Sequence, residues 1–103
     1  MQISIKTPQQ LGLAIRATRR AQKVRLDDVS GSAGVGHVFT REVEHGKETV
    51  QLGRVMRLLE ELGIELMVDV PDEAMAELAH LRKTGLRPLK PRAKRAPTQD
   101  STK

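Results

Sequence analysis

With 103 residues, the chain is long enough for one domain, or for one domain and a tail. It has no cysteine, no apolar core of a signal peptide and no segment of membrane-spanning length, so disulfide frameworks, zinc fingers and thiol nucleophiles are excluded and a cytoplasmic protein is expected. The net charge of +5 combines basic blocks at residues 1–47 and 81–103 with an acidic block at 48–80, which suggests a polyanionic partner.

Two helices are predicted in the first third of the chain. Thr7 and Pro8 are typical of a helix start, and apolar residues then recur at helical spacing to about Gln22. A short second helix is expected from Leu26 to Ala33, although its serines and glycine have poor helix propensity. The inward-facing residues of the two helices are predicted to be Leu11, Ala14, Ile15 and Thr18, followed by Leu26, Val29 and Ala33.

The stretch GVGHVFTREVEHGK, residues 34–47, predicts a third helix between glycines. Gly34 is suited to the left-handed end of the second helix, and Gly36 begins the third. Val35, Phe39 and Val43 are spaced four apart and form one buried stripe, while Thr40 stands beside it where a larger aliphatic residue is expected. A fourth helix is predicted over residues 50–62, with an apolar face of Leu52, Val55, Met56, Leu59 and Leu62, and Gly63 ends it.

The period of the pattern then changes from helical to two. Four apolar residues alternate with Glu65, Met67 and Asp69 before Pro71, which predicts a half-buried strand. No second convincing strand exists, so we expect a partner chain to contribute its own copy and form a two-stranded ribbon across a homodimer axis. The residues of this dimerisation strand are Ile64, Leu66, Val68 and Val70.

The predicted organisation has three parts. Residues 1–71 form one domain that contains the four predicted helices and the dimerisation strand, residues 72–84 contain an amphipathic helix, and residues 85–103 form a disordered basic tail. The predicted fold class is mostly α. The tail has high positive charge and no aromatic residue, which favours contacts with phosphates over base reading.

Two short helices joined by a tight turn, with one helix before and one after, are typical of a helix-turn-helix domain. The second helix of such a pair enters the DNA major groove. If the stripe that includes Phe39 faces the core, His37, Val38 and Arg41 face outward. Arg41 could bond guanine and Val38 could contact a thymine methyl, so these three are the candidate base-contacting residues.

Candidate phosphate contacts surround this helix. Gly36 leaves the unpaired N–H groups of the helix start open to a phosphate. The polar face of the first helix is either solvated or in contact with the DNA backbone, and we favour the second interpretation. The full candidate set is Gly36, Arg16, Arg20, Lys23 and Lys47.

The "GVG" turn, Phe39, the run "EVEHGKETVQLGRV" and the passage "LGIEL" resemble the lambda-repressor-like, Xre-type helix-turn-helix family, and more narrowly the HipB-type antitoxins. The resemblance covers residues 7 to about 70. It implies a five-element fold, a homodimer sharing a small β-lid, and binding to palindromic operator DNA. In members encoded beside a HipA-type serine/threonine kinase toxin, it also implies toxin neutralisation and repression of the shared operon. It further implies a scaffold pair between Arg19 and Glu44.

Two departures from the family pattern bear on DNA binding. Relatives often have Thr or Ser followed by Gln where Arg25 and Leu26 stand, and Leu26 cannot make the corresponding phosphate contact. Arginine is common where Val38 stands. These differences imply weaker DNA binding or a different operator.

Other functions were weighed against this one. The sequence is compatible with a stand-alone Xre-family regulator without a toxin partner, and with a toxin-binding module that has little DNA binding. We expect no enzyme activity and no cofactor, because the chain has no catalytic triad pattern and no phosphate-cradling loop. His37, His45 and His80 lack i, i+4 spacing, so no metal site is expected.

Overall fold

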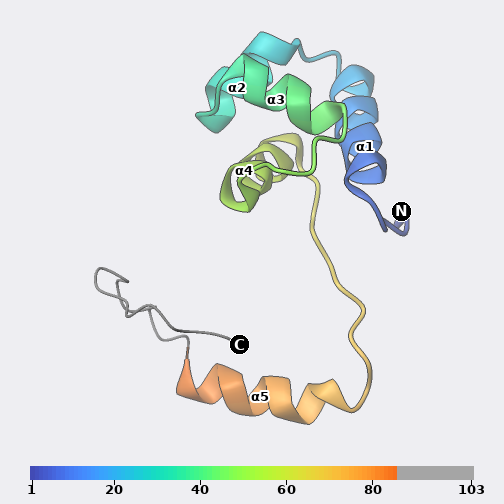
Figure 1. Ribbon diagram of the computed structural model, residues 1–103, viewed down its shortest axis with the longest axis vertical. Helices are drawn as coiled ribbons and strands as arrows, with labels where there is room; N and C mark the ends of the chain where they lie inside the picture. The colour runs from blue at the N-terminus through green and yellow to red at the C-terminus, as the bar shows by residue number, and fades with distance from the viewer. Residues whose placement is uncertain (86–103) are drawn as a thin grey trace, which may run out of the picture. The chain divides into compact units, whose positions relative to one another are not determined.

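The computed structural model describes residues 1–85 and contains five helices in that range (Figure 1). The predicted tail, from residue 86 onward, lies outside the described residues. The helices are α1 (Pro8–Ala21), α2 (Leu26–Ala33), α3 (His37–Glu44), α4 (Leu52–Leu62) and α5 (Ala74–Thr84). All five were predicted from the sequence, with boundaries that differ by at most two residues.

Local chemistry explains where the helices begin and end. The Thr7 hydroxyl accepts a hydrogen bond from the Gln10 backbone N–H at 3.1 Å, which caps α1. Gly34 and Gly63 follow α2 and α4 with φ angles of 73° and 74°, a left-handed conformation that costs glycine little. The predicted caps and stops are therefore confirmed at these positions.

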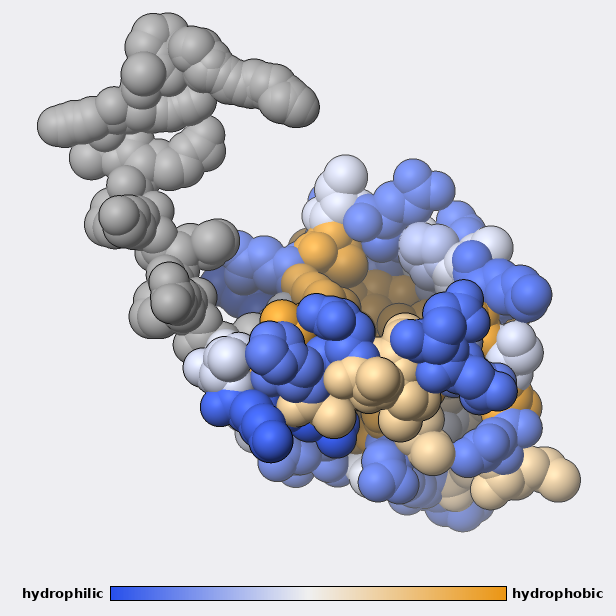
Figure 2. Space-filling model, turned by 90° about the horizontal axis from the view of Figure 1, so that it is seen from below, coloured by the Kyte–Doolittle hydropathy of each residue, from blue (hydrophilic) through white to orange (hydrophobic). Residues whose placement is uncertain are grey.

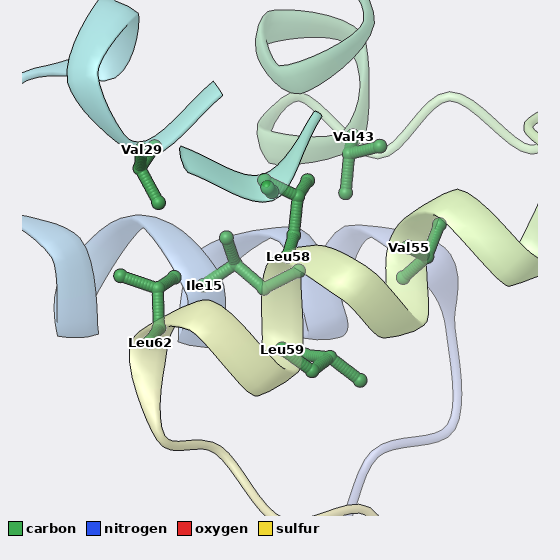
Figure 3. Close-up of a cluster of buried hydrophobic side chains, with 8 residues drawn as sticks. Ile15, Val29, Val43, Val55, Leu58, Leu59 and Leu62 are labelled. Carbon is green, nitrogen blue, oxygen red and sulfur yellow. The ribbon is translucent and has the colours of Figure 1, made fainter. Parts of the chain in front are cut away.

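The core lies between α1, α2, α3 and α4 (Figure 3). Ile15 and Leu58 are completely buried, and Val35 and Phe39 pack against the cluster while remaining partly exposed. The buried hydrophobic residues are Ile15, Val29, Ala33, Val43, Val55, Leu58, Leu59 and Leu62. This cluster is built almost entirely from aliphatic side chains, as the composition requires.

The predicted inner face of α4 was partly wrong. Leu52 is 65% exposed and Met56 is 46% exposed, whereas Leu58 is buried although the sequence pattern did not select it. The helix is rotated so that Val55, Leu58 and Leu62 face the core. Leu52 and Met56 consequently reach the surface. In the view of Figure 2, hydrophobic atoms in orange and tan are visible among hydrophilic atoms in blue.

Helices α1 and α3 approach each other closely at Gly12. A Cβ atom at this position would lie 2.4 Å from the Val43 carbonyl oxygen and 2.8 Å from that of Glu44. Because both neighbours are backbone atoms, only glycine allows this contact. Gly12 therefore fixes α3 against α1 and supports the orientation of the predicted DNA-reading helix.

Residues 1–67 form one compact unit, and Val68 begins a second unit that includes α5. No side chain of α5 is buried. None of the five helices described has the length and hydropathy of a membrane span.

The predicted strand over residues 64–70 is not formed within the single chain, and no β-strand occurs among residues 1–85. A strand needs a neighbour for its backbone hydrogen bonds, and residues 1–85 offer none to this segment. Leu66 and Val68 are 51% and 78% exposed. Pairing of this segment with a second copy stays a prediction.

Candidate nucleic-acid interface

Helices α2 and α3 are joined by a turn of three residues. After Gly34, the Val35 backbone N–H donates to the Ser30 carbonyl at 2.9 Å, and Gly36 then occupies the N-cap of α3 in extended conformation. The Gly36 side of the turn is open, since a Cβ there would meet no atom within 4 Å. The start of α3 is thus accessible to an approaching molecule.

Helix α3 has one buried face and one exposed face. Thr40, Val43 and Glu44 are at most 4% exposed. His37, Val38 and Arg41 lie on the surface, and Val38 is 55% exposed. The three predicted base-contacting residues are therefore brought together on the outward face of one helix.

The predicted phosphate contacts are distributed over α1 and the turn after α3. Arg20, Lys23 and Lys47 are exposed, while Arg16 is half-buried. Lys23 has a positive φ of 60°, which is unusual for a residue with a side chain. The Lys47 ammonium lies 3.2 Å from a Glu42 carboxylate oxygen in an exposed ion pair, so this carboxylate would compete with a phosphate for Lys47.

A bidentate ion pair joins α1 to the end of α3. Arg19 Nε donates to Glu44 Oε2 at 2.6 Å and Arg19 Nη2 donates to Glu44 Oε1 at 3.0 Å, while Arg19 Nη1 reaches the Val24 carbonyl at 3.1 Å. The hydrogen bond to Glu44 raises the pKa of Arg19, and burial opposes that shift. The pair is the scaffold contact that the family resemblance implied.

Two arginines of α4 contact α3 and the turn before it, and sequence patterns alone did not select them. Arg54 lies over the Phe39 ring, 5.9 Å from its centroid, and Arg57 Nη1 donates to the Gly34 carbonyl at 3.5 Å. They are the only arginine or lysine residues in the acidic block 48–80. Two basic residues in an otherwise acidic block could have been noticed in the sequence, but the sequence does not reveal which residues they contact.

The described part of the chain contains no candidate cation site. Within residues 1–85, no three His, Asp or Glu side chains form a group that could hold a metal ion. The chemistry available on the surface of α3 is therefore hydrogen bonding by His37 and Arg41 and apolar contact by Val38.

Comparisons with known proteins agree with this geometry. No protein-family model matches the chain. It is 41% identical over 69 residues to y4mF of Sinorhizobium fredii, named an uncharacterized HTH-type (helix-turn-helix) transcriptional regulator, and the match covers 67% of this chain and 91% of y4mF. The chain belongs to the HTH-type transcriptional regulators.

Solved structures define the fold more narrowly. A chain in the structure of the HipA-HipB-O2-O3 complex matches with a TM-score of 0.63 at 16% identity, covering 67% of this chain and 97% of that chain. A chain of the HipB-O4 20mer complex matches with a TM-score of 0.63 at 16% identity, again covering 67% and 97%. The described domain thus has the HipB fold, as the resemblance implied.

Proposed function

We propose that the protein is a sequence-specific DNA-binding repressor whose recognition helix is α3. The observation that carries the proposal is the outward position of His37, Val38 and Arg41 on a helix whose opposite face is buried. This arrangement allows the exposed face of α3 to enter the major groove while its opposite face stays packed against the core. Membership in the HTH-type regulators and the fold shared with the HipB chain of the O4 20mer complex support it.

We further propose that two copies bind one operator. A lone segment with period-two alternation, Ile64 to Val70, would pair with its counterpart in a second copy. Two recognition helices related by a two-fold axis would then contact half-sites about 34 Å apart on one face of the DNA. The exposed side chains of Leu66 and Val68 supply apolar surface for that pairing.

The proposed physiological role is that of the antitoxin of a type II module. The protein would neutralise a HipA-like serine/threonine kinase toxin and repress the operon that encodes both. Support comes from the HipB fold, since one matching chain belongs to the HipA-HipB-O2-O3 complex. Co-purification from the native operon tests this role, and the expected result is a kinase-sized protein and DNA bound together to the chain.

A stand-alone transcriptional regulator is the second candidate. Support comes from the relative y4mF, which is named an uncharacterized HTH-type transcriptional regulator and is 41% identical to this chain over 69 residues. Both candidates require the same DNA surface. If DNA but no kinase-sized protein co-purifies with the chain, the stand-alone role is favoured.

DNA binding itself is tested by selecting duplexes from a random-sequence pool with the wild-type protein. We expect enrichment of one palindromic sequence, and an affinity for it that falls steeply with salt as phosphate contacts release counterions. The selected duplex should bind at least about a thousandfold more tightly than a scrambled duplex. Failure to enrich any sequence would contradict sequence-specific recognition.

A further inference from the structure

Two buried hydroxyl groups join α2 to α3. Ser30 and Thr40 are 2% and 0% exposed, and their hydroxyl oxygens lie 2.6 Å apart. Ser30 Oγ also lies 2.7 Å from the Leu26 carbonyl, and Thr40 Oγ1 lies 3.2 Å from the Gly36 carbonyl. A hydrogen bond between two buried side chains thus joins the helices at a position where packed helices usually make apolar contacts.

The two hydroxyl protons can be placed in two ways. Ser30 can donate to Thr40 while Thr40 donates to the Gly36 carbonyl, or Thr40 can donate to Ser30 while Ser30 donates to the Leu26 carbonyl. The bond between the two hydroxyls is present in both arrangements. Neither proton lacks an acceptor, so the pair is a satisfied buried network.

The outer side of this junction is open, while its inner side is held by the packing of Val35 and Phe39 against the core and by the backbone bond from Val35 to Ser30. Gly31 and Gly36 lie on this outer side, and a Cβ at either position would meet no atom within 4 Å. A shallow hollow lined by residues that include Gly31, Gly36 and His37 opens there. Among residues 1–85, the bond between the two hydroxyls is the one side-chain hydrogen bond that joins α2 to α3. Because a hydrogen bond is directional, it constrains the first turn of α3 relative to α2 in a way that apolar packing does not.

From this geometry we infer that the Ser30–Thr40 pair positions the recognition helix, and that Thr40 is a positioning residue for discrimination between DNA sequences. Thr40 touches no surface and so contacts no base itself. It acts through the first turn of α3, which carries His37 and Val38. The inference rests on the proposed function. It adds two buried residues, Ser30 and Thr40, to those that determine the DNA specificity of α3.

Replacement of Thr40 separates positioning from stability. Thr40→Val keeps the shape of the side chain and removes its hydroxyl, while Ser30 retains the Leu26 carbonyl as acceptor. Thr40→Ser keeps the hydroxyl and removes a methyl group, which leaves a small cavity. The first variant therefore tests the bond, and the second is its matched control.

The measurements are the melting temperature and the ratio of affinities for the duplex selected by wild type and a scrambled duplex, at fixed salt. We expect Thr40→Val to retain its melting temperature within a few degrees and to lose about tenfold in the ratio, as when one base contact weakens. Thr40→Ser should melt lower but keep the ratio. A wild-type ratio in Thr40→Val, or a ratio that follows melting temperature in both variants, would overturn the inference.

Hydrogen exchange gives a readout that does not depend on DNA. The backbone N–H of residue 40 donates to the Gly36 carbonyl at 3.1 Å, so its exchange reports on the first turn of α3. In Thr40→Val this amide should exchange faster, with the Ile15 amide unchanged; unchanged exchange at both would sink the inference. If wild type selects no duplex, the proposed function fails, and the exchange result alone decides about positioning.

Discussion

At the scale of single residues, the contrast between Glu44 and Glu42 shows what burial does to an ion pair. Both carboxylates lie on α3 and both pair with a cation, but the Glu44 side chain is 3% exposed and that of Glu42 is 39% exposed. Removing one partner of a buried pair leaves an uncompensated charge, whereas an exposed pair is screened by water.

We therefore expect Glu44→Gln to lower the free energy of unfolding by about 3 kcal/mol, because Arg19 would lose its charged partner. Glu42→Gln, the matched control, should lower it by about 0.5 kcal/mol or less. Urea denaturation at neutral pH measures both values. Equal losses in the two variants would show that the Arg19–Glu44 pair is not a structural contact.

The sign of the pH dependence follows from the raised pKa of Arg19. A folded-state pKa above the unfolded value stabilises the protein fully below the unfolded pKa, and this contribution is lost as pH rises through the folded pKa. Since arginine titrates only in strong alkali, the contribution of Arg19 should be constant from about pH 7 to about pH 10. Denaturation midpoints of wild type and Glu44→Gln should keep a constant separation in that range; a separation that shrinks would contradict it.

At the scale of helices, two glycines inside α1 and α4 make opposite predictions. A Cβ at Gly12 would collide with the backbone of Val43, whereas a Cβ at Gly53 would meet nothing within 4 Å. Gly12→Ala should destabilise the protein by about 3 kcal/mol, because α1 and α3 must separate. Gly53→Ala should stabilise it by about 0.5 kcal/mol through helix propensity.

Thermal denaturation of the two alanine variants checks this pair. The melting temperature should fall for Gly12→Ala and rise slightly for Gly53→Ala. If Gly12→Ala melts like wild type, α3 is not seated on α1 as described.

Helix starts and stops were predictable from sequence because caps and glycines act locally. Thr7, Gly34 and Gly63 each determine a boundary through their own conformation or hydrogen bond. The rotation of α4 was not predictable, because Leu52 and Leu58 have equal hydrophobicity and only packing against other helices distinguishes them. The contact of Gly12 with the backbone of α3 and the hydrogen bond of Thr40 with Ser30 both join residues distant in sequence. For the hydrogen bond, the one indication in the sequence was a threonine where an aliphatic residue is expected.

The same limit applies to the candidate site. Helical periodicity was sufficient to predict that His37, Val38 and Arg41 face outward, because the buried residues of α3 define the opposite face. Periodicity could not find Arg54 and Arg57, which reach α3 and the turn from another helix.

At the scale of the whole molecule, the proposed dimer depends on which face of the segment 64–70 is apolar. Leu66 and Met67 are neighbours with similar exposure, 51% and 61%, but a strand would direct them to opposite faces. Leu66→Glu should therefore give a monomer in sedimentation equilibrium and weaken binding to the selected duplex at least about tenfold, since one half-site contact is lost. Met67→Glu should remain a dimer.

Two outcomes would contradict this account of assembly. If the wild-type protein sediments as a monomer at micromolar concentration, residues 64–70 do not pair with a second copy as proposed. If Leu66→Glu stays dimeric, the subunits associate through some other surface, for example around Leu52 and Met56.

The central claim is that the outward face of α3 reads DNA bases, and Arg41→Ala tests it most directly. Selection from the random pool should show relaxed preference at one base pair of each half-site, with a loss of about 1–3 kcal/mol on the wild-type duplex. Lys23→Ala, the control, should weaken all duplexes alike and reduce the salt slope by about one. If Arg41→Ala selects and binds the same sequence as wild type, α3 is not the reading surface.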